Sequence, residues 1–200
     1  MNNLNFEGIG SAQGGEYDRV SIEGLCTCKG DIKARSISIE GIFHGKGMIE
    51  AGDFDCTGVA EMSGDIRARK MNVSGVVSVK GTKVEAEDIE CDGTINIDGE
   101  ISADRIYANG FVNASEIVGD EVTINSEFGG FSRIIIRKFS KIELIEATKV
   151  NVSNVKAKKV SGADLIIGPK CKIDVVDCSG TLRVDPSAEI GEIIGEYEMR

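Results

Sequence analysis

Tryptophan is absent from this chain of 200 residues, proline occurs only twice, and aromatic side chains make up 5% of the total. A core built from large rings is therefore excluded, and we expect a narrow interior lined by small aliphatic side chains. The sequence also lacks a run of about 18 apolar residues, which a membrane-spanning helix needs, and it lacks a secretory signal pattern. These absences make the cytoplasm the default location.

Glycine, by contrast, is abundant, with 25 residues, and its positions are periodic. Two glycine columns recur about every 17 residues over the first 120 residues, and columns of alanine and of isoleucine or valine keep step. Columns that share one period indicate a repeat protein, whose units bury their apolar side chains by stacking on one another. The glycine columns are Gly24, Gly41, Gly58, Gly75, Gly93 and Gly110, and Gly30, Gly47, Gly64, Gly81 and Gly99.

One copy of the repeat, residues 37–53, has apolar or small side chains at alternate positions, as in Ile37, Ile39 and Gly41. This spacing is typical of a strand, and the glycines divide each copy into about three short strands. Stacking the copies about 4.8 Å apart pairs each strand with the next and encloses one apolar column. The sequence therefore predicts an all-β fold, a parallel β-helix (β-solenoid) of about ten coils of about 17 residues.

The columns also set the predicted boundaries. Residues 1–17 match none of them and are expected to form a flexible tail, residues 18–195 the β-helix domain, and residues 196–200 a short C-terminal tail. The fourth copy has one extra residue before Val84, which a corner must accommodate, and the register slips after Ala114. Residues 125–141 fit the columns poorly and predict a longer loop. Its Phe128 and Phe131 are either a contact site or plugs of an enlarged coil.

The net charge of −10 is unevenly distributed. Residues 133–172 contain ten Lys or Arg and three acidic residues, a local charge of +7, so the rest of the chain carries −17. This basic stretch is either a face that binds an acidic partner or a membrane surface, or an ordinary solvated face. The candidate basic face comprises Arg133, Arg137, Lys138, Lys141, Lys156, Lys158 and Lys159.

Four of the six cysteines occupy repeat positions that hold aliphatic or small residues in other copies, which favours buried thiols that act as small apolar side chains. A Cys-x-Cys zinc or redox site at Cys26 and Cys28 is the alternative. The only histidine, His44, lies at an outward position and is a weak candidate for a catalytic base. We therefore expect no metal, no cofactor and no catalytic residues.

The Ile-x-Gly motif, the second glycine six places on and the Ile-x-Ala that closes each copy resemble the bactofilin family of polymer-forming bacterial cytoskeletal proteins, over about residues 20–194. Residues 114–122 and 165–194 resemble the long-core members from Gram-positive bacteria. The resemblance implies a right-handed β-helix of triangular cross-section that assembles end to end, without nucleotide, into scaffolds for cell shape, motility or subcellular organisation. Many members also carry an N-terminal membrane-targeting peptide, so contact with the inner face of the cell membrane stays open.

A solenoid also has a physical reason to polymerise, because its two end coils expose unpaired strand edges. Neither end of this sequence shows an amphipathic helix that could cover them, and joining ends between copies produces an open filament. The predicted partner is therefore a second copy of the chain, with scaffolded proteins as further partners. The predicted polymer ends are Val20, Ile22 and Ile32 at one end and Leu182, Val184, Ile190 and Ile193 at the other.

Other functions fit the sequence less well. A hexapeptide-repeat acyltransferase builds each coil from three hexapeptides, which is longer than the repeat of this chain, and its histidine base would have only His44 as a candidate. Calcium-binding solenoid repeats and a phosphate-binding Walker loop are missing. Nucleic acid is disfavoured because the basic stretch has no aromatic interleaving suited to base stacking, and because the rest of the molecule would repel phosphate. The remaining rival to a filament is an interaction module that does not polymerise and uses the basic face.

Overall fold

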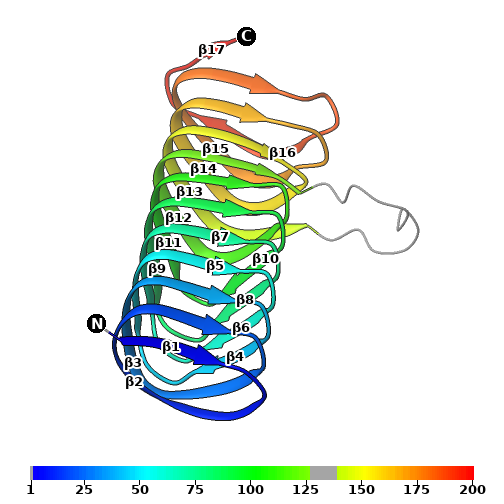
Figure 1. The fold of residues 1–200 in the computed structure, drawn as a ribbon. Helices are drawn as coiled ribbons and strands as arrows, with labels where there is room; N and C mark the ends of the chain where they lie inside the picture. Colours follow the sequence, from blue (N-terminus) through cyan, green and yellow to red (C-terminus); the bar gives the residue numbers. More distant parts are fainter. Residues whose placement is uncertain (1, 127–138) are drawn as a thin grey trace, which may run out of the picture.

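The computed structural model describes residues 2–126 and 139–200. These residues form strands and connecting turns without a helix, and the strands pair in parallel, so the chain winds as a β-solenoid of about 11 turns with a spacing of about 17 residues (Figure 1). The strands at the front of Figure 1 run to the right while the chain climbs from the N-terminus to the C-terminus, so the winding is right-handed. The predicted fold class is confirmed.

The short strands of the N-terminal half alternate with longer ones that continue around a corner. The strands are β1 (Asn2–Phe6), β2 (Ile9–Ile22), β3 (Leu25–Ile39), β4 (Ile42–Gly45), β5 (Ile49–Cys56), β6 (Val59–Met62), β7 (Ile66–Val73), β8 (Val76–Val79), β9 (Lys83–Cys91), β10 (Thr94–Ile97), β11 (Glu100–Ala108), β12 (Phe111–Asn125), β13 (Ser140–Ser153), β14 (Val155–Ile167), β15 (Lys172–Val184), β16 (Glu189–Ile194) and β17 (Glu198–Met199).

Each coil has three sides, which we name by one example: face A holds residues 54–56, face B residues 59–62 and face C residues 66–68. Each face of this coil contributes two buried side chains, and the residue between them points outward. Alternation with a period of two thus recurs on all three sides, as the sequence predicts. The six inward residues of this coil are Phe54, Cys56, Ala60, Met62, Ile66 and Ala68.

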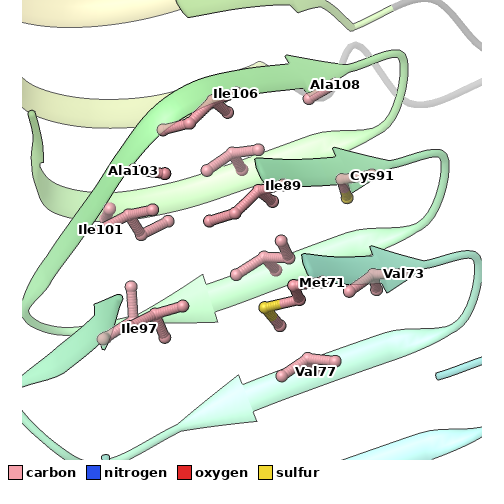
Figure 2. Close-up of a cluster of buried hydrophobic side chains, with 14 of the residues drawn as sticks. Met71, Val73, Val77, Ile89, Cys91, Ile97, Ile101, Ala103, Ile106 and Ala108 are labelled. Atoms are coloured by element: carbon pink, nitrogen blue, oxygen red, sulfur yellow. The ribbon is translucent and has the colours of Figure 1, made fainter. Parts of the chain in front are cut away.

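The inward side chains of successive coils stack into one continuous core. Figure 2 shows this on face A, where Met71 and Val73 lie below Ile89 and Cys91, which in turn lie below Ile106 and Ala108. The core side chains are small and aliphatic, and most are less than 5% exposed. Burial of such side chains contributes roughly 25 cal/mol per Å² of apolar surface, and it requires neighbouring coils on both sides.

The corner between faces A and B is built from stacked glycines. A Cβ atom on Gly58 would collide with the carbonyl oxygen of Gly41, and a Cβ on Gly75 would collide with that of Gly58. The backbone N–H of the residue after each glycine donates to the glycine carbonyl of the preceding coil, as Val59 does to Gly41 at 2.9 Å. The first glycine column is therefore required by close backbone approach at this corner.

Two irregularities predicted from the sequence are confirmed. We call the number of residues between two paired positions of adjacent coils the step. The step from Ile66 to its partner Val84 is one residue longer than the step from Ile49 to Ile66, and the extra residue lies at the corner between faces B and C. After Ala114 the step becomes one position shorter than the regular one, since Ile101 pairs with Ile117. The expected loop over 125–141 corresponds to a much longer step, from Ile117 to Ile145, and residues 127–138 within it lie outside the described residues.

Both predicted tails are corrected by the structure. Residues 2–17 are not a flexible tail, because β1 and the first part of β2 form a complete first coil with Leu4 opposite Val20 and Ile9 opposite Leu25. At the other end, β17 pairs with β15 through Leu182 and Met199, so residues 198–199 belong to the solenoid. The β-helix therefore covers the chain almost from end to end and gains one coil over the predicted ten.

Candidate functional site

The first candidate surface is the N-terminal end coil. Its strand β1 pairs with β2 alone, so no described strand pairs with its other edge. Leu4, Phe6 and Tyr17 are only partly buried and pack against the core. The Phe6 ring lies over Gly10, where an added Cβ would be 3.4 Å from the ring, and the Tyr17 hydroxyl donates to the carbonyl of Gln13 at 2.9 Å. Aromatic rings thus partly close this end of the core.

The second candidate surface is the C-terminal end coil. Ile190 lies opposite Ile173 and Ile193 opposite Val176, each with its outer side uncovered by any described strand. Both are only partly buried, as is Tyr197, and Met199 is 63% exposed. The coil also holds five carboxylates and one arginine. These are Asp185, Glu189, Glu192, Glu196, Glu198 and Arg200.

The predicted polymer ends agree with these surfaces at one end only. Val184, Ile190 and Ile193 lie in or next to the last coil, and Leu182 is buried beneath Met199. At the other end the prediction lies one coil too far inside. The predicted residues Val20, Ile22 and Ile32 are 0%, 0% and 2% exposed and are covered by the coil of residues 2–17.

The outward side chains form ladders of alternating charge along the rod. Lys33 pairs with Glu50 at 2.6 Å, and Arg67 pairs with Glu85 at 3.1 Å. The Arg105 guanidinium binds both oxygens of Asp88, at 2.5 and 2.9 Å, and this hydrogen bonding lowers the pKa of the Asp88 carboxyl. Each pair joins adjacent coils, as the alternating signs in the sequence predict. Such exposed pairs contribute little stability individually.

Two of the four described lysines of the candidate basic face are paired with carboxylates. Lys158 pairs with Glu143 at 2.8 Å and Lys159 with Asp177 at 2.7 Å. Lys141 and Lys156 lie opposite each other in adjacent coils, and no described carboxylate lies within ion-pair distance of either. A shallow hollow of about 430 Å³ beside them is also lined by Asp98, Glu143 and Asp174, so its charge is mixed. The predicted Arg133, Arg137, Lys138, Phe128 and Phe131 lie outside the described residues.

These ion pairs are not visible when one segment is considered alone, because the partner carboxylates come from a neighbouring coil. Asp177 follows Lys159 by one coil and lies beyond the basic stretch, as does Glu189, which pairs with Lys172 at 2.7 Å. A charge count within one segment therefore overstates the charge of a face. Aligning the charges at the period of the coil would have revealed the pairs.

All six cysteines are free and buried, as expected for thiols that act as small apolar side chains. Burial raises the pKa of Cys56 to about 11 and that of Cys91 to about 12, so both stay protonated at neutral pH. His44 is partly exposed, and its Nδ1 lies 3.1 Å from Glu61 Oε2 in the next coil. In the parts of the chain described here, no group of three or more His, Cys, Asp or Glu is placed to hold a metal ion.

Ser126 and Ser140 belong to a buried polar cluster that the sequence analysis did not identify. Ser126 and Ser140, 2% and 0% exposed, flank residues 127–138, and their hydroxyl oxygens lie 2.7 Å apart. The Val112 N–H donates to the Ser140 hydroxyl at 3.0 Å, and the Asn154 side-chain amide donates to the Ser126 carbonyl at 2.8 Å. Hydrogen bonds to the preceding and the following coil thus hold Ser126 and Ser140 in place.

Comparisons with known proteins do not assign the chain to a family. No protein-family model matches it, and no solved structure matches it. Over 48 residues it is 48% identical to the uncharacterized protein YhbE of Bacillus subtilis (strain 168), a match that covers 24% of this chain and 20% of that protein. Within the described residues there is no helix long and apolar enough to cross a membrane. The fold and its two end coils are therefore the features that bear on function.

Proposed function

We propose that this chain is a structural scaffold that polymerises end to end into filaments without nucleotide. One observation carries the proposal: each end coil combines an unpaired strand edge with partly exposed apolar side chains of the core. Natural sheets normally cover or charge such edges to prevent association. A second coil placed on either end would pair the free backbone groups and complete the burial of Phe6 or Ile190.

The resemblance of the repeat to bactofilins supports the same function, with filaments that organise cell shape, motility or subcellular positions in the cytoplasm or at the inner face of the cell membrane. The part of the chain that matches YhbE is short, and YhbE is itself uncharacterized, so the match adds no function. The partner that the fold itself supplies is another copy of the chain. This scaffold has no catalytic role for His44 or for the buried thiols.

Negative-stain microscopy and pelleting of the purified chain test the proposal, at low and at high salt and without nucleotide. We expect long filaments whose width matches one or a few rods. The double variant Ile190→Asp and Ile193→Asp, at the C-terminal end, and Phe6→Asp, at the N-terminal end, should leave short particles. The control Ser78→Asp, at an outward position in the middle of the rod, should polymerise as the wild type does.

The alternative is an interaction module that stays small and binds an acidic partner or an anionic membrane surface. Its support is the stacking of Lys141 on Lys156 without a described ion-pair partner. The microscopy separates the two functions, because the module would give only small particles at every salt concentration. In that case the variant Lys141→Glu and Lys156→Glu should lose binding to anionic vesicles, and Lys29→Glu, directly after face B and nearer the N-terminus, should keep it.

A further inference from the structure

A column of aliphatic side chains lies on the outside of the rod at the start of face B. Its members pair in register through five consecutive coils, Ile9 with Leu25, Leu25 with Ile42, Ile42 with Val59, and Val59 with Val76. Ile9 is 86% exposed, Ile42 41% and Val76 37%. We name this column the aliphatic stripe. Its residues are Ile9, Leu25, Ile42, Val59 and Val76.

The core does not need the stripe. The next residues along face B, such as Phe43 after Ile42 and Val77 after Val76, already fill the interior at 1% and 0% exposure. No described residue covers the stripe, which at about 4.8 Å per coil extends roughly 20 Å along the rod. Contiguous exposed apolar surface of this kind marks an interaction site.

Charges of opposite sign flank the stripe. Glu7, Glu23 and Glu40 stack on the face A side, and Lys29 and Lys46 stand on the other side, with Lys80 in the last coil of the stripe. All six side chains are exposed, and none forms an ion pair with a described residue, in contrast to the paired ladders elsewhere on the rod. Stacked like charges cost free energy in an isolated rod. A partner that brings opposite charges to both edges would remove that cost.

We propose that the aliphatic stripe is a lateral contact between two copies of this chain, which lie side by side and parallel with a two-fold axis along the stripe. A second copy is the partner that fits, because its own stripe repeats at the same axial spacing and matches residue for residue over five coils. The contact is isologous, so it closes as a pair. It does not depend on the end-to-end joint of the scaffold, and the two contacts can be tested separately.

The flanking charges select the parallel orientation. When the two-fold axis runs along the stripe, the glutamate edge of each copy lies on the lysine side of its partner. Rotation about an axis across the stripe would instead place the glutamate edge of one copy against that of the other, with Glu40 near its own counterpart. Opposed like charges oppose this antiparallel pairing, whereas long lysine side chains can reach the carboxylates in the parallel pair.

Disulfide trapping tests the proposal in rods whose C-terminal end is blocked by Ile190→Asp and Ile193→Asp. In the parallel pair every stripe residue meets its own counterpart, so Ile42→Cys and Val76→Cys, made one at a time, should each give a linked dimer under mild oxidation. Tyr107→Cys, 49% exposed on face A, is the matched control and should stay monomeric. The native thiols are buried and do not compete.

A second measurement uses rods with unmodified ends. Ile42→Glu with Val59→Glu should reduce filament width to that of a single rod while leaving filament length and the circular dichroism spectrum unchanged. The proposal is overturned if neither single-cysteine rod links although both remain folded. Linkage of Ile9→Cys with Val76→Cys in mixtures, without linkage of either alone, would overturn the parallel pair in favour of the antiparallel one. If neither the unmodified protein nor the stripe variant forms filaments, the result counts against the scaffold function and leaves the lateral contact to the disulfide test.

Discussion

The carboxylate of Asp65 accepts hydrogen bonds from the backbone N–H groups of Thr82 and Lys83, at 2.6 and 2.9 Å, in the next coil. These two residues form the corner that accommodates the extra residue of the lengthened step from Ile66 to Val84. The side chain therefore satisfies N–H groups that the enlarged corner removes from the regular ladder. An insertion is tolerated here because the preceding coil supplies an acceptor for it.

Replacing Asp65 by alanine should lower the free energy of unfolding by about 1 kcal/mol at neutral pH, the usual effect of losing a side-chain cap. Hydrogen bonding, first from the Lys83 N–H, lowers the pKa of Asp65 below its ordinary value of 3.8. A lowered carboxyl pKa gives stability that is present above the ordinary value and lost as pH falls through the lowered one. The difference between variant and wild type in urea unfolding should therefore shrink at pH values below 3.8.

Asp31 provides the matched control, because its carboxylate accepts a single backbone N–H, that of Met48 at 2.8 Å, at the equivalent corner. Asp31→Ala should cost less than Asp65→Ala. Equal losses for the two variants would show that the extra residue does not depend on its cap.

The solenoid could be predicted from the sequence because the coil length is nearly constant where the core is aliphatic. Ile49, Ile66 and Val84 occupy one column with steps that differ by a single position, and a column of glycines fixes each corner. The end coil was missed because Gly10, Ala12 and Gly15 replace the aliphatic residues of those columns, and the register shifts between Gln13 and Gly15. The rings of Phe6 and Tyr17 fill the space that these small residues leave.

The candidate site was only partly predictable for a related reason. The alternating period of a strand identifies outward positions, and so the alternation of Lys33 with Glu50 was visible. The hydrogen bond between Ser126 and Ser140 could not be predicted, since a segment that follows no column separates these residues in the sequence. The aliphatic stripe could have been identified from the sequence, because Leu25, Ile42 and Val59 each follow a glycine of the first column.

Gly58→Ala should destabilise the rod by about 3 kcal/mol, because the new Cβ would collide with the Gly41 carbonyl and force two coils apart. The midpoint of thermal unfolding measures the loss. Gly10→Ala is the control, since its Cβ would make an ordinary contact of 3.4 Å with the Phe6 ring, and its stability should be close to that of the wild type. A tolerated alanine at residue 58 would contradict the close-packed corner.

Ser140→Ala should cost about 1–3 kcal/mol, since it leaves the Val112 N–H without its acceptor in a buried position. Ser126→Ala should cost less, because among the described residues its hydroxyl is bonded only to Ser140, and its carbonyl still accepts the Asn154 amide. Urea unfolding of the two variants measures the difference. Hydrogen exchange at Val112 should rise in Ser140→Ala and stay slow in Ser126→Ala, and the reverse order would contradict this assignment.

End-to-end assembly should accelerate with added salt. The C-terminal coil has five acidic residues against one arginine, and Glu7 and Glu16 lie in the N-terminal coil, so every joint between copies brings negative charge together. Salt screens this repulsion over a Debye length of about 8 Å at physiological ionic strength. Light scattering at increasing salt checks the direction. The variant Glu192→Gln with Glu196→Gln should assemble faster at low salt and depend less on salt, and an unchanged salt dependence would argue against charge at this end.

The native thiols should not react with a thiol reagent until the protein unfolds. All six are buried, and desolvation raises the pKa of Cys26, Cys28, Cys56, Cys91 and Cys171, so these five thiols carry little thiolate at pH 8. Their reaction rate should therefore follow the fraction unfolded in urea, whereas the added thiol of Ile42→Cys should react at once. Cys91→Ala should be tolerated, because Ala108 occupies the same column one coil later, while Cys91→Ser should cost more by burying a hydroxyl. A fast-reacting native thiol at neutral pH would reopen the redox interpretation of the cysteines.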